Sequence, residues 1–227
     1  MKGKLYVVAT PIGNLEDITF RAIDTLKKVD CIAAEDTRVS YRLLKKYEVK
    51  KELIPFHVKN ENSKVEYIVE LLLSGKNVAI ISDAGTPCIS DPGYLLINKA
   101  RNLDIDVYSI PGASSVTSAL SVAGLPSERF FFEGFLPKKK GRVTRMSYLS
   151  SLDVSIVLFE SPYRMIKTLN DILNIMGDRF VSVCKELTKI NESNYYGKVS
   201  RVILDFDKMT KVKGEYVIIV AKESYDE

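Results

Sequence analysis

The chain has 227 residues, 46% of them hydrophobic and 27% charged, with a formal net charge of +4, which is typical of a globular protein. No apolar run reaches the roughly 20 residues of a membrane span, and the N-terminus is too short for a signal peptide, so we expect a cytoplasmic protein without membrane association. The three cysteines lack metal-ligand spacing and the only histidine is His57, so we expect no metal site.

Strands and helices are predicted to alternate through the first half of the chain. Short apolar runs predict strands at 5–10, 31–34, 78–82 and 105–110. Apolar residues at helical spacing predict helices at 19–29, 37–47, 64–74, 93–100 and 114–123. Regular alternation with nearly continuous apolar strands predicts an α/β domain, with a mostly parallel sheet and helices on both faces.

The pattern changes after residue 123, where a Gly-Leu-Pro-Ser loop begins. We therefore predict an N-terminal domain at 1–123, a linker region at 124–137 and a C-terminal α/β domain at 138–227. Strands are predicted in the last of these at 154–159, 180–184, 195–199 and 216–221, with a helix at 163–175. Few helices separate the late strands, which favours a mixed sheet.

Three predicted strands of the first half end in loops rich in Gly, Pro and small polar residues. These loops are Thr10–Asn14, Ser82–Gly93 and Ile110–Ser115. Glycines permit close backbone approach, and ligands of open α/β sheets lie at the carboxyl ends of strands. Asp83 is a candidate carboxylate for a ligand ammonium or ribose hydroxyl, and Ser114 and Ser115 can cap a helix or donate to a ligand. A plain turn is the alternative for each loop taken alone.

Common fingerprints of other enzyme classes are absent from the sequence. It contains no Gly-x-x-x-x-Gly-Lys-Ser/Thr phosphate loop, no Gly-x-Gly-x-x-Gly after a strand and no Gly-x-Ser-x-Gly nucleophile elbow. These absences argue against a P-loop nucleotidase, the usual dinucleotide fold and a serine hydrolase.

A run of five cations in eight residues lies at 138–145, without an acidic residue. Such a run attracts polyanions, although a solvated linker or helix face is the alternative. Its cations are candidate RNA contacts: Lys138, Lys139, Lys140, Arg142 and Arg145.

Six motifs in order resemble the ribosomal RNA small-subunit methyltransferase I family of the tetrapyrrole-methylase superfamily. They are Thr10–Leu15, Ala34–Arg38, Ser82–Pro87, Ile110–Ser115, Phe159–Arg164 and Lys185–Lys189. The likeness runs from about residue 4 to residue 221. It implies a two-domain homodimer that binds S-adenosylmethionine between its domains and methylates the 2′-hydroxyl of a cytidine in the decoding region of 16S ribosomal RNA, on the small ribosomal subunit.

The resemblance also implies which residues contact the cofactor. Strand-end loops supply the methionine and ribose contacts, and the second domain supplies the adenine contacts. The candidate set is Pro11, Asp83, Gly85, Thr86, Pro87, Ser114, Ser115, Phe159, Ser161, Leu187 and Gly214.

The proton acceptor is not identified by the sequence, because several groups could assist a ribose hydroxyl. The candidates are Glu35, Asp36, Arg38, His57 and Glu186. Capping of a helix by Asp36 is the alternative for that residue. The sequence departs from the family at Lys59, which replaces a second histidine, and it ends soon after the last predicted strand, where many members continue into a helical extension.

Two other functions remain open at this stage. A methyltransferase of the same fold could act on a tetrapyrrole or a protein side chain, and a ribosome assembly factor could keep the pocket without catalysis. The basic run and the Ala34–Arg38 and Phe159–Arg164 motifs favour RNA.

Overall fold

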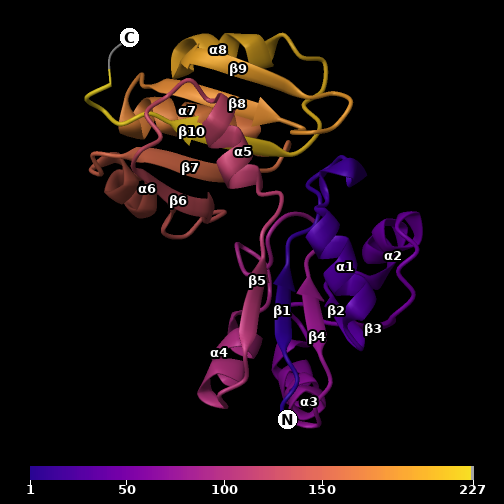
Figure 1. Ribbon diagram of the computed structural model, residues 1–227. Helices are drawn as coiled ribbons and strands as arrows, with labels where there is room; N and C mark the ends of the chain where they lie inside the picture. The colour runs from indigo at the N-terminus through magenta and orange to yellow at the C-terminus, as the bar shows by residue number, and fades with distance from the viewer. Residues whose placement is uncertain (226–227) are drawn as a thin grey trace. The chain divides into compact units, whose positions relative to one another are not determined.

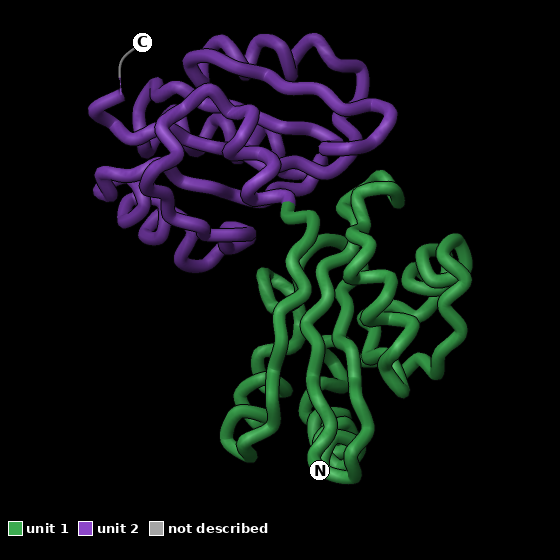
Figure 2. Tube along the Cα trace, viewed as in Figure 1, with its two compact units in different colours: residues 1–114 green, residues 115–227 purple. Residues whose placement is uncertain are grey.

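The computed structural model describes residues 1–225 and shows two compact units, residues 1–114 and 115–227 (Figure 2). Each unit has its own five-stranded sheet and its own hydrophobic core. No helix within the described residues is both long and apolar enough to cross a membrane.

The first unit alternates strands and helices as its hydrophobic pattern predicts (Figure 1). Its strands are β1 (Leu5–Val8), β2 (Cys31–Ala34), β3 (Glu52–Pro55), β4 (Val78–Ile81) and β5 (Val107–Ile110). Its helices are the 3₁₀ turn η1 (Leu15–Asp17), α1 (Phe20–Lys28), α2 (Thr37–Lys46), α3 (Glu61–Leu73) and α4 (Tyr94–Asn102). All strand pairs are parallel, in the order β3-β2-β4-β1-β5.

Helices cover both faces of this sheet because its central strands are apolar on both sides. Ala33 and Ile80 pack with α3 and α4, whereas Ile32 and Ile81 pack with α1 and α2. β2 and β4 are neighbours, but the chain runs from β2 toward β3 and from β4 toward β5, in opposite directions. Their carboxyl ends therefore form a topological switch point, where open α/β sheets bind ligands.

The second unit contains a mixed sheet. Its strands are β6 (Phe130–Phe135), β7 (Ser155–Glu160), β8 (Phe180–Lys185), β9 (Ser193–Lys198) and β10 (Tyr216–Val220). Its helices are α5 (Ser115–Val122), α6 (Arg142–Ser150), α7 (Met165–Met176) and α8 (Val199–Asp207). In the order β6-β7-β10-β8-β9, only β6 and β7 are parallel.

Alternate residues of β7 and β10 face two different environments. Ile156, Leu158 and Ile218 pack beneath α6, α7 and α8 in one fully buried cluster. The opposite face carries α5, and the thiol of Cys184 contacts the carbonyl of Ala119 there. The predicted fold class, a parallel sheet followed by a mixed one, is confirmed.

The division between the units differs from the predicted one. It lies between residues 114 and 115, so α5 belongs to the second unit, and the predicted linker 124–137 contains β6. The helix-like pattern of α5 gives no sign of which sheet it joins. β3, α6 and α8 were also not predicted. β3 is only partly buried, and α6 begins within the basic run.

Candidate active site

Main-chain and hydroxyl hydrogen bonds join the three predicted strand-end loops of the first unit. Thr10 and Gly85 form an isolated antiparallel bridge, with N–H to oxygen distances of 2.9 and 3.0 Å. The hydroxyl of Thr86 donates to the carbonyl of Ala113 at 3.2 Å. The loops after β1, β4 and β5 are thus held together at one edge of the sheet. This edge carries the predicted cofactor residues of the first unit, which are Pro11, Asp83, Gly85, Thr86, Pro87 and Ser114.

Glycines make this close approach possible. Gly85 has φ +81°, in the region that favours glycine, and an added Cβ would lie 3.3 Å from the Ile12 side chain. At Gly112 an added Cβ would lie 3.0 Å from the Cβ of Ala9, so the β5 loop packs directly on the end of β1. A larger residue at either position would push these loops apart.

Acidic side chains link the ends of β2 and β4 at the switch point. The Asp83 carboxylate accepts a hydrogen bond from the Asp36 amide at 2.9 Å, and Glu35 accepts one from the Asp83 amide at 3.4 Å. Each carboxylate thus bonds the opposite strand end.

Burial is the main reason that three carboxyl groups here are difficult to ionise. It raises the pKa values of Glu35 and Asp83, and the neighbouring acids raise them further. The pKa of Asp91 rises to about 6, through burial and then through repulsion from Glu35. Asp91 was not among the sequence candidates, because Ser-Asp-Pro-Gly reads as a turn. The sequence could have pointed to Asp91 only because it lies in the same loop as Asp83.

Asp36 and Arg38 have mainly a structural role in this arrangement. Asp36 is the N-cap of α2 and accepts from the Arg38 amide at 2.9 Å, while the two side chains form an ion pair at 2.6 Å. The Arg38 guanidinium holds the pKa of Asp36 well below its usual range, so this carboxylate is a poor proton acceptor. His57 lies near Glu35 and favours its charged form.

The predicted adenine-contacting residues of the second unit also lie at one edge of its sheet. Tyr216 of β10 is paired with Glu160 of β7 on one side and with Lys185 of β8 on the other. Four predicted cofactor residues belong to β7 or to the adjoining loops at this edge, namely Phe159, Ser161, Leu187 and Gly214. Ser115, which was predicted with the strand-end loops to contact the methionine or ribose, is the first residue of α5.

Hydrogen bonds of Glu186 stabilise this edge of the sheet. Its carboxylate accepts from the Glu215 amide at 2.9 Å and from the Lys189 ammonium at 3.0 Å. Partial burial opposes its charge, but these donors outweigh burial and lower the pKa of Glu186. Gly214 has φ +105°, and an added Cβ would lie 2.7 Å from the Glu186 side chain. These contacts make Glu186 a positioning residue and weaken its candidacy as a base.

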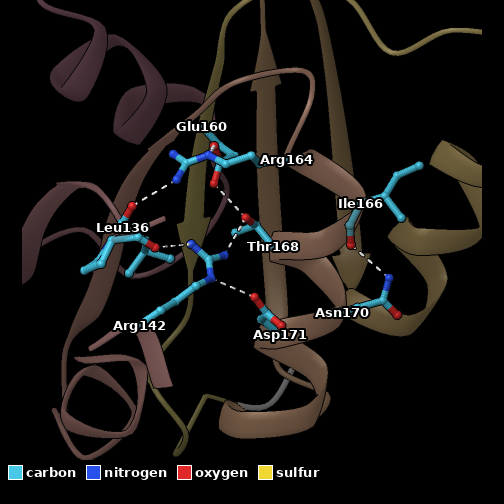
Figure 3. A network of polar contacts seen from close by, with 9 residues as sticks. Leu136, Arg142, Glu160, Arg164, Ile166, Thr168, Asn170 and Asp171 are labelled. Carbon is cyan, nitrogen blue, oxygen red and sulfur yellow. Dashed lines mark hydrogen bonds and ion pairs between the residues drawn. The ribbon is translucent and has the colours of Figure 1, made fainter. Parts of the chain in front are cut away.

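The predicted basic run separates into buried and exposed cations. The Arg142 guanidinium is buried and bonds Asp171 at 2.8 Å and the Thr168 hydroxyl at 2.7 Å (Figure 3). The prediction that Arg142 contacts RNA is therefore wrong, since its donors serve the protein interior. Arg145 is held by three hydrogen bonds to the Glu133 carboxylate. Lys138, Lys139 and Lys140 are exposed, and none of them forms an ion pair with another residue of 1–225.

Comparison with known proteins identifies the family. Residues 4–202 match the Tetrapyrrole (Corrin/Porphyrin) Methylases. The Ribosomal RNA small subunit methyltransferase I of Thermotoga maritima is 48% identical over 96% of this chain and 98% of its own length. The protein of that name from Halalkalibacterium halodurans is 44% identical over 96% of this chain and 76% of its own. The chain belongs to the ribosomal RNA small subunit methyltransferase I family.

Solved structures confirm that the fold of this family member is that of the tetrapyrrole methylases. Diphthine synthase has a TM-score of 0.75 and covers 98% of this chain and 90% of its own, at 15% identity. Identity this low reports the fold alone, so the chemistry has to come from the site.

The side chains at the first unit's strand ends suit the charges of S-adenosylmethionine. That molecule carries a sulfonium and an ammonium, and Asp83, a half-buried carboxylate with a raised pKa, gains stability when a cation neutralises it. It has no phosphate, in keeping with a site that has no glycine-rich phosphate loop. Among the described residues, no group of three or more metal-ligating side chains is present.

Proposed function

We propose that this protein transfers a methyl group from S-adenosylmethionine to the 2′-hydroxyl of a cytidine in the decoding region of 16S ribosomal RNA. Family membership supports an RNA methyltransferase, and two close relatives carry the name Ribosomal RNA small subunit methyltransferase I. The substrate is then the small ribosomal subunit, and the enzyme works in the cytoplasm as a homodimer.

The observation that carries the proposal is the joined set of loops after β1, β4 and β5, with its half-buried acids. We assign Asp83, Thr86 and Ser114 to the methionine and ribose parts of the cofactor. One oxygen of the Asp83 carboxylate accepts from the Asp36 amide, which fixes the carboxylate, and we assign the second oxygen to the cofactor. Phe159 and Leu187 are assigned to the adenine.

When bound, S-adenosylmethionine supplies an electrophilic methyl carbon on a sulfonium. The protein must hold the ribose oxygen in line behind that carbon, which alone can account for much of the acceleration. A protonated hydroxyl is a weak nucleophile, so a proton acceptor with a pKa near neutrality helps. Asp91 meets this condition, with a pKa of about 6, and Glu35 beside it is raised in the same direction. We assign the proton-accepting role to this pair in preference to Asp36 and Glu186, whose pKa values are lowered.

The exposed lysines of the basic run supply the electrostatic part of RNA binding. Lys138, Lys139 and Lys140 follow one another in a turn closed by the hydrogen bond from the Arg142 amide to the Lys139 carbonyl at 3.2 Å. Contacts of this kind bring RNA to the protein without reading its sequence.

Calorimetric titration with S-adenosylmethionine tests the site assignment. The wild type should bind, and Asp83→Ala and a bulky replacement, Gly85→Leu, should both lose binding. Asp24→Ala, which removes an exposed carboxylate from α1, is the matched control and should bind normally. Undiminished binding in both site variants would refute the assignment.

A further inference from the structure

Two aromatic side chains of the second unit are exposed beside the lysine turn. The Tyr163 side chain is 95% exposed and Phe135 is 57% exposed. A single exposed aromatic residue is common, but these two belong to segments that hydrogen bonds hold next to the exposed lysines 138–140.

Tyr163 stands in a turn whose two ends are held by one buried carboxylate. Glu160 accepts from the Ser161 amide at 2.7 Å and pairs with the Arg164 guanidinium at 2.8 Å. The Arg164 amide closes the turn by donating to the Ser161 carbonyl at 3.1 Å, and Pro162 restricts the backbone within it. The turn is therefore ordered without any contribution from the tyrosine ring, which is left free to contact a ligand.

The same buried network anchors the lysine turn (Figure 3). Arg164 donates to the Leu136 carbonyl at 3.0 Å, and Arg142 donates to the Pro137 carbonyl at 3.2 Å. Because Arg164 follows Tyr163 and Leu136 follows Phe135, the first of these bonds brings the two aromatic segments together. The Lys138–Lys140 turn begins immediately after Pro137.

A β-bulge directs Phe135 to this surface. The register of β6 against β7 shifts between Phe132 and Gly134, so Phe132 and Phe135 both pack edge-on against Phe159, with ring centroids 5.0 and 5.6 Å away. Three positions along a regular strand would place these two rings on opposite faces. The bulge thus supports Phe135 from beneath and leaves its outer side exposed.

We propose that Phe135 and Tyr163 form a stacking platform for unpaired bases of the RNA substrate, with the phosphates of the same strand on Lys138–Lys140. Aromatic rings beside a positive strip are the combination that proteins use for single-stranded nucleic acid, because bases stack while lysines neutralise the backbone. Glu133 of β6 and Glu160 of β7 are both paired with arginines, so their charges do not oppose an RNA strand. This inference rests on the proposed function, which makes an RNA strand the substrate.

Fluorescence anisotropy with a labelled, unstructured RNA of about ten nucleotides, at one fixed salt concentration, tests the platform. Tyr163→Ala and Phe135→Ala should each weaken binding about tenfold, and Tyr163→Phe should restore it. The same oligonucleotide with abasic positions should bind all these variants and the wild type equally. Tyr67→Ala removes an exposed tyrosine of α3 that has a lysine over its ring, and should bind as the wild type does.

Unchanged RNA binding in both alanine variants, or wild-type affinity for abasic RNA equal to that for intact RNA, would overturn the platform. Parallel calorimetry with S-adenosylmethionine separates it from the cofactor site. Tyr163→Ala should bind S-adenosylmethionine as tightly as the wild type does. If the variant lost affinity for RNA and for S-adenosylmethionine to the same extent, the Tyr163 ring would contact the adenine of the cofactor instead of an RNA base. A wild type that binds the RNA through these rings but methylates no ribosomal subunit would refute the proposed function and leave the platform standing.

Discussion

Replacing Asp91 with asparagine should stabilise the folded protein above about pH 6. Burial and the neighbouring Glu35 raise the pKa of Asp91 from 3.8 to about 6. The full shift corresponds to about 3 kcal/mol against the charged form, and solvent screening of this half-buried group reduces that figure. Asparagine has nearly the same shape, carries no charge and can still accept from the Ser82 hydroxyl. We therefore expect Asp91→Asn to increase the free energy of unfolding by about 1–3 kcal/mol at pH 7.5.

The sign of the pH dependence follows from proton binding. Between about pH 4 and pH 6 the folded wild type holds a proton on Asp91 that the unfolded chain has released, so its stability falls as the pH rises. The asparagine variant lacks this fall. Its advantage should be absent near pH 4, grow up to pH 6 and then stay constant.

Urea denaturation at pH 4, 5, 6 and 7.5 measures this difference. Asp24→Asn, which changes an exposed carboxylate of α1, is the control and should alter the free energy of unfolding by less than about 0.5 kcal/mol throughout. An Asp91→Asn variant whose stability relative to the wild type is the same at pH 4 and pH 7.5 would refute the reasoning. The variant should also lose methyl transfer while it continues to bind S-adenosylmethionine, if Asp91 accepts the proton.

Three further predictions concern the second unit. Arg142→Ala should lower the free energy of unfolding by about 3 kcal/mol or more in urea denaturation, because it breaks a buried pair, whereas Lys139→Ala should change it by less than about 0.5 kcal/mol. Gly214→Ala should destabilise the protein clearly more than Gly141→Ala in the same assay, since both glycines have positive φ but of the two only Gly214 would meet a neighbouring side chain; equal losses would contradict this. Replacing Lys138–Lys140 with glutamine should reduce the slope of log binding constant against log salt by about 2 for single-stranded RNA, measured by anisotropy, and an unchanged slope would remove these lysines from the interface.

The sequence predicted most of the fold because hydrophobic periodicity and strand-end turns are local signals. Four of the five strands of the first unit, β1, β2, β4 and β5, and the loops after β1, β4 and β5 were identified from residues alone. β3 was not predicted, because Ile54 is its only buried residue and its apolar pattern is therefore weak. The boundary between the units was not predicted correctly, because the residues of α5 do not reveal that this helix packs on β10.

Side-chain roles were harder to predict, because they depend on partners distant in the chain. Arg142 and the three lysines cannot be distinguished within a basic run. Arg142 differs only in that its guanidinium is buried and bonds Thr168 and Asp171, which belong to another helix. Asp36 and Asp91 are both acids in turns. The charge of Asp36 is stabilised by Arg38 of the helix that it caps, whereas the charge of Asp91 is disfavoured by burial and by Glu35. Phe135 reaches the surface through a bulge that a strand pattern does not reveal.

Methyl transfer to a ribose hydroxyl of 16S ribosomal RNA can be measured by incubating the purified protein with labelled S-adenosylmethionine and unmethylated small ribosomal subunits. We expect label in one cytidine of the decoding region, at a phosphodiester that becomes resistant to alkaline cleavage, and no label with Asp83→Ala. Label on a base or on a ribosomal protein, or none on the subunit at all, would contradict it.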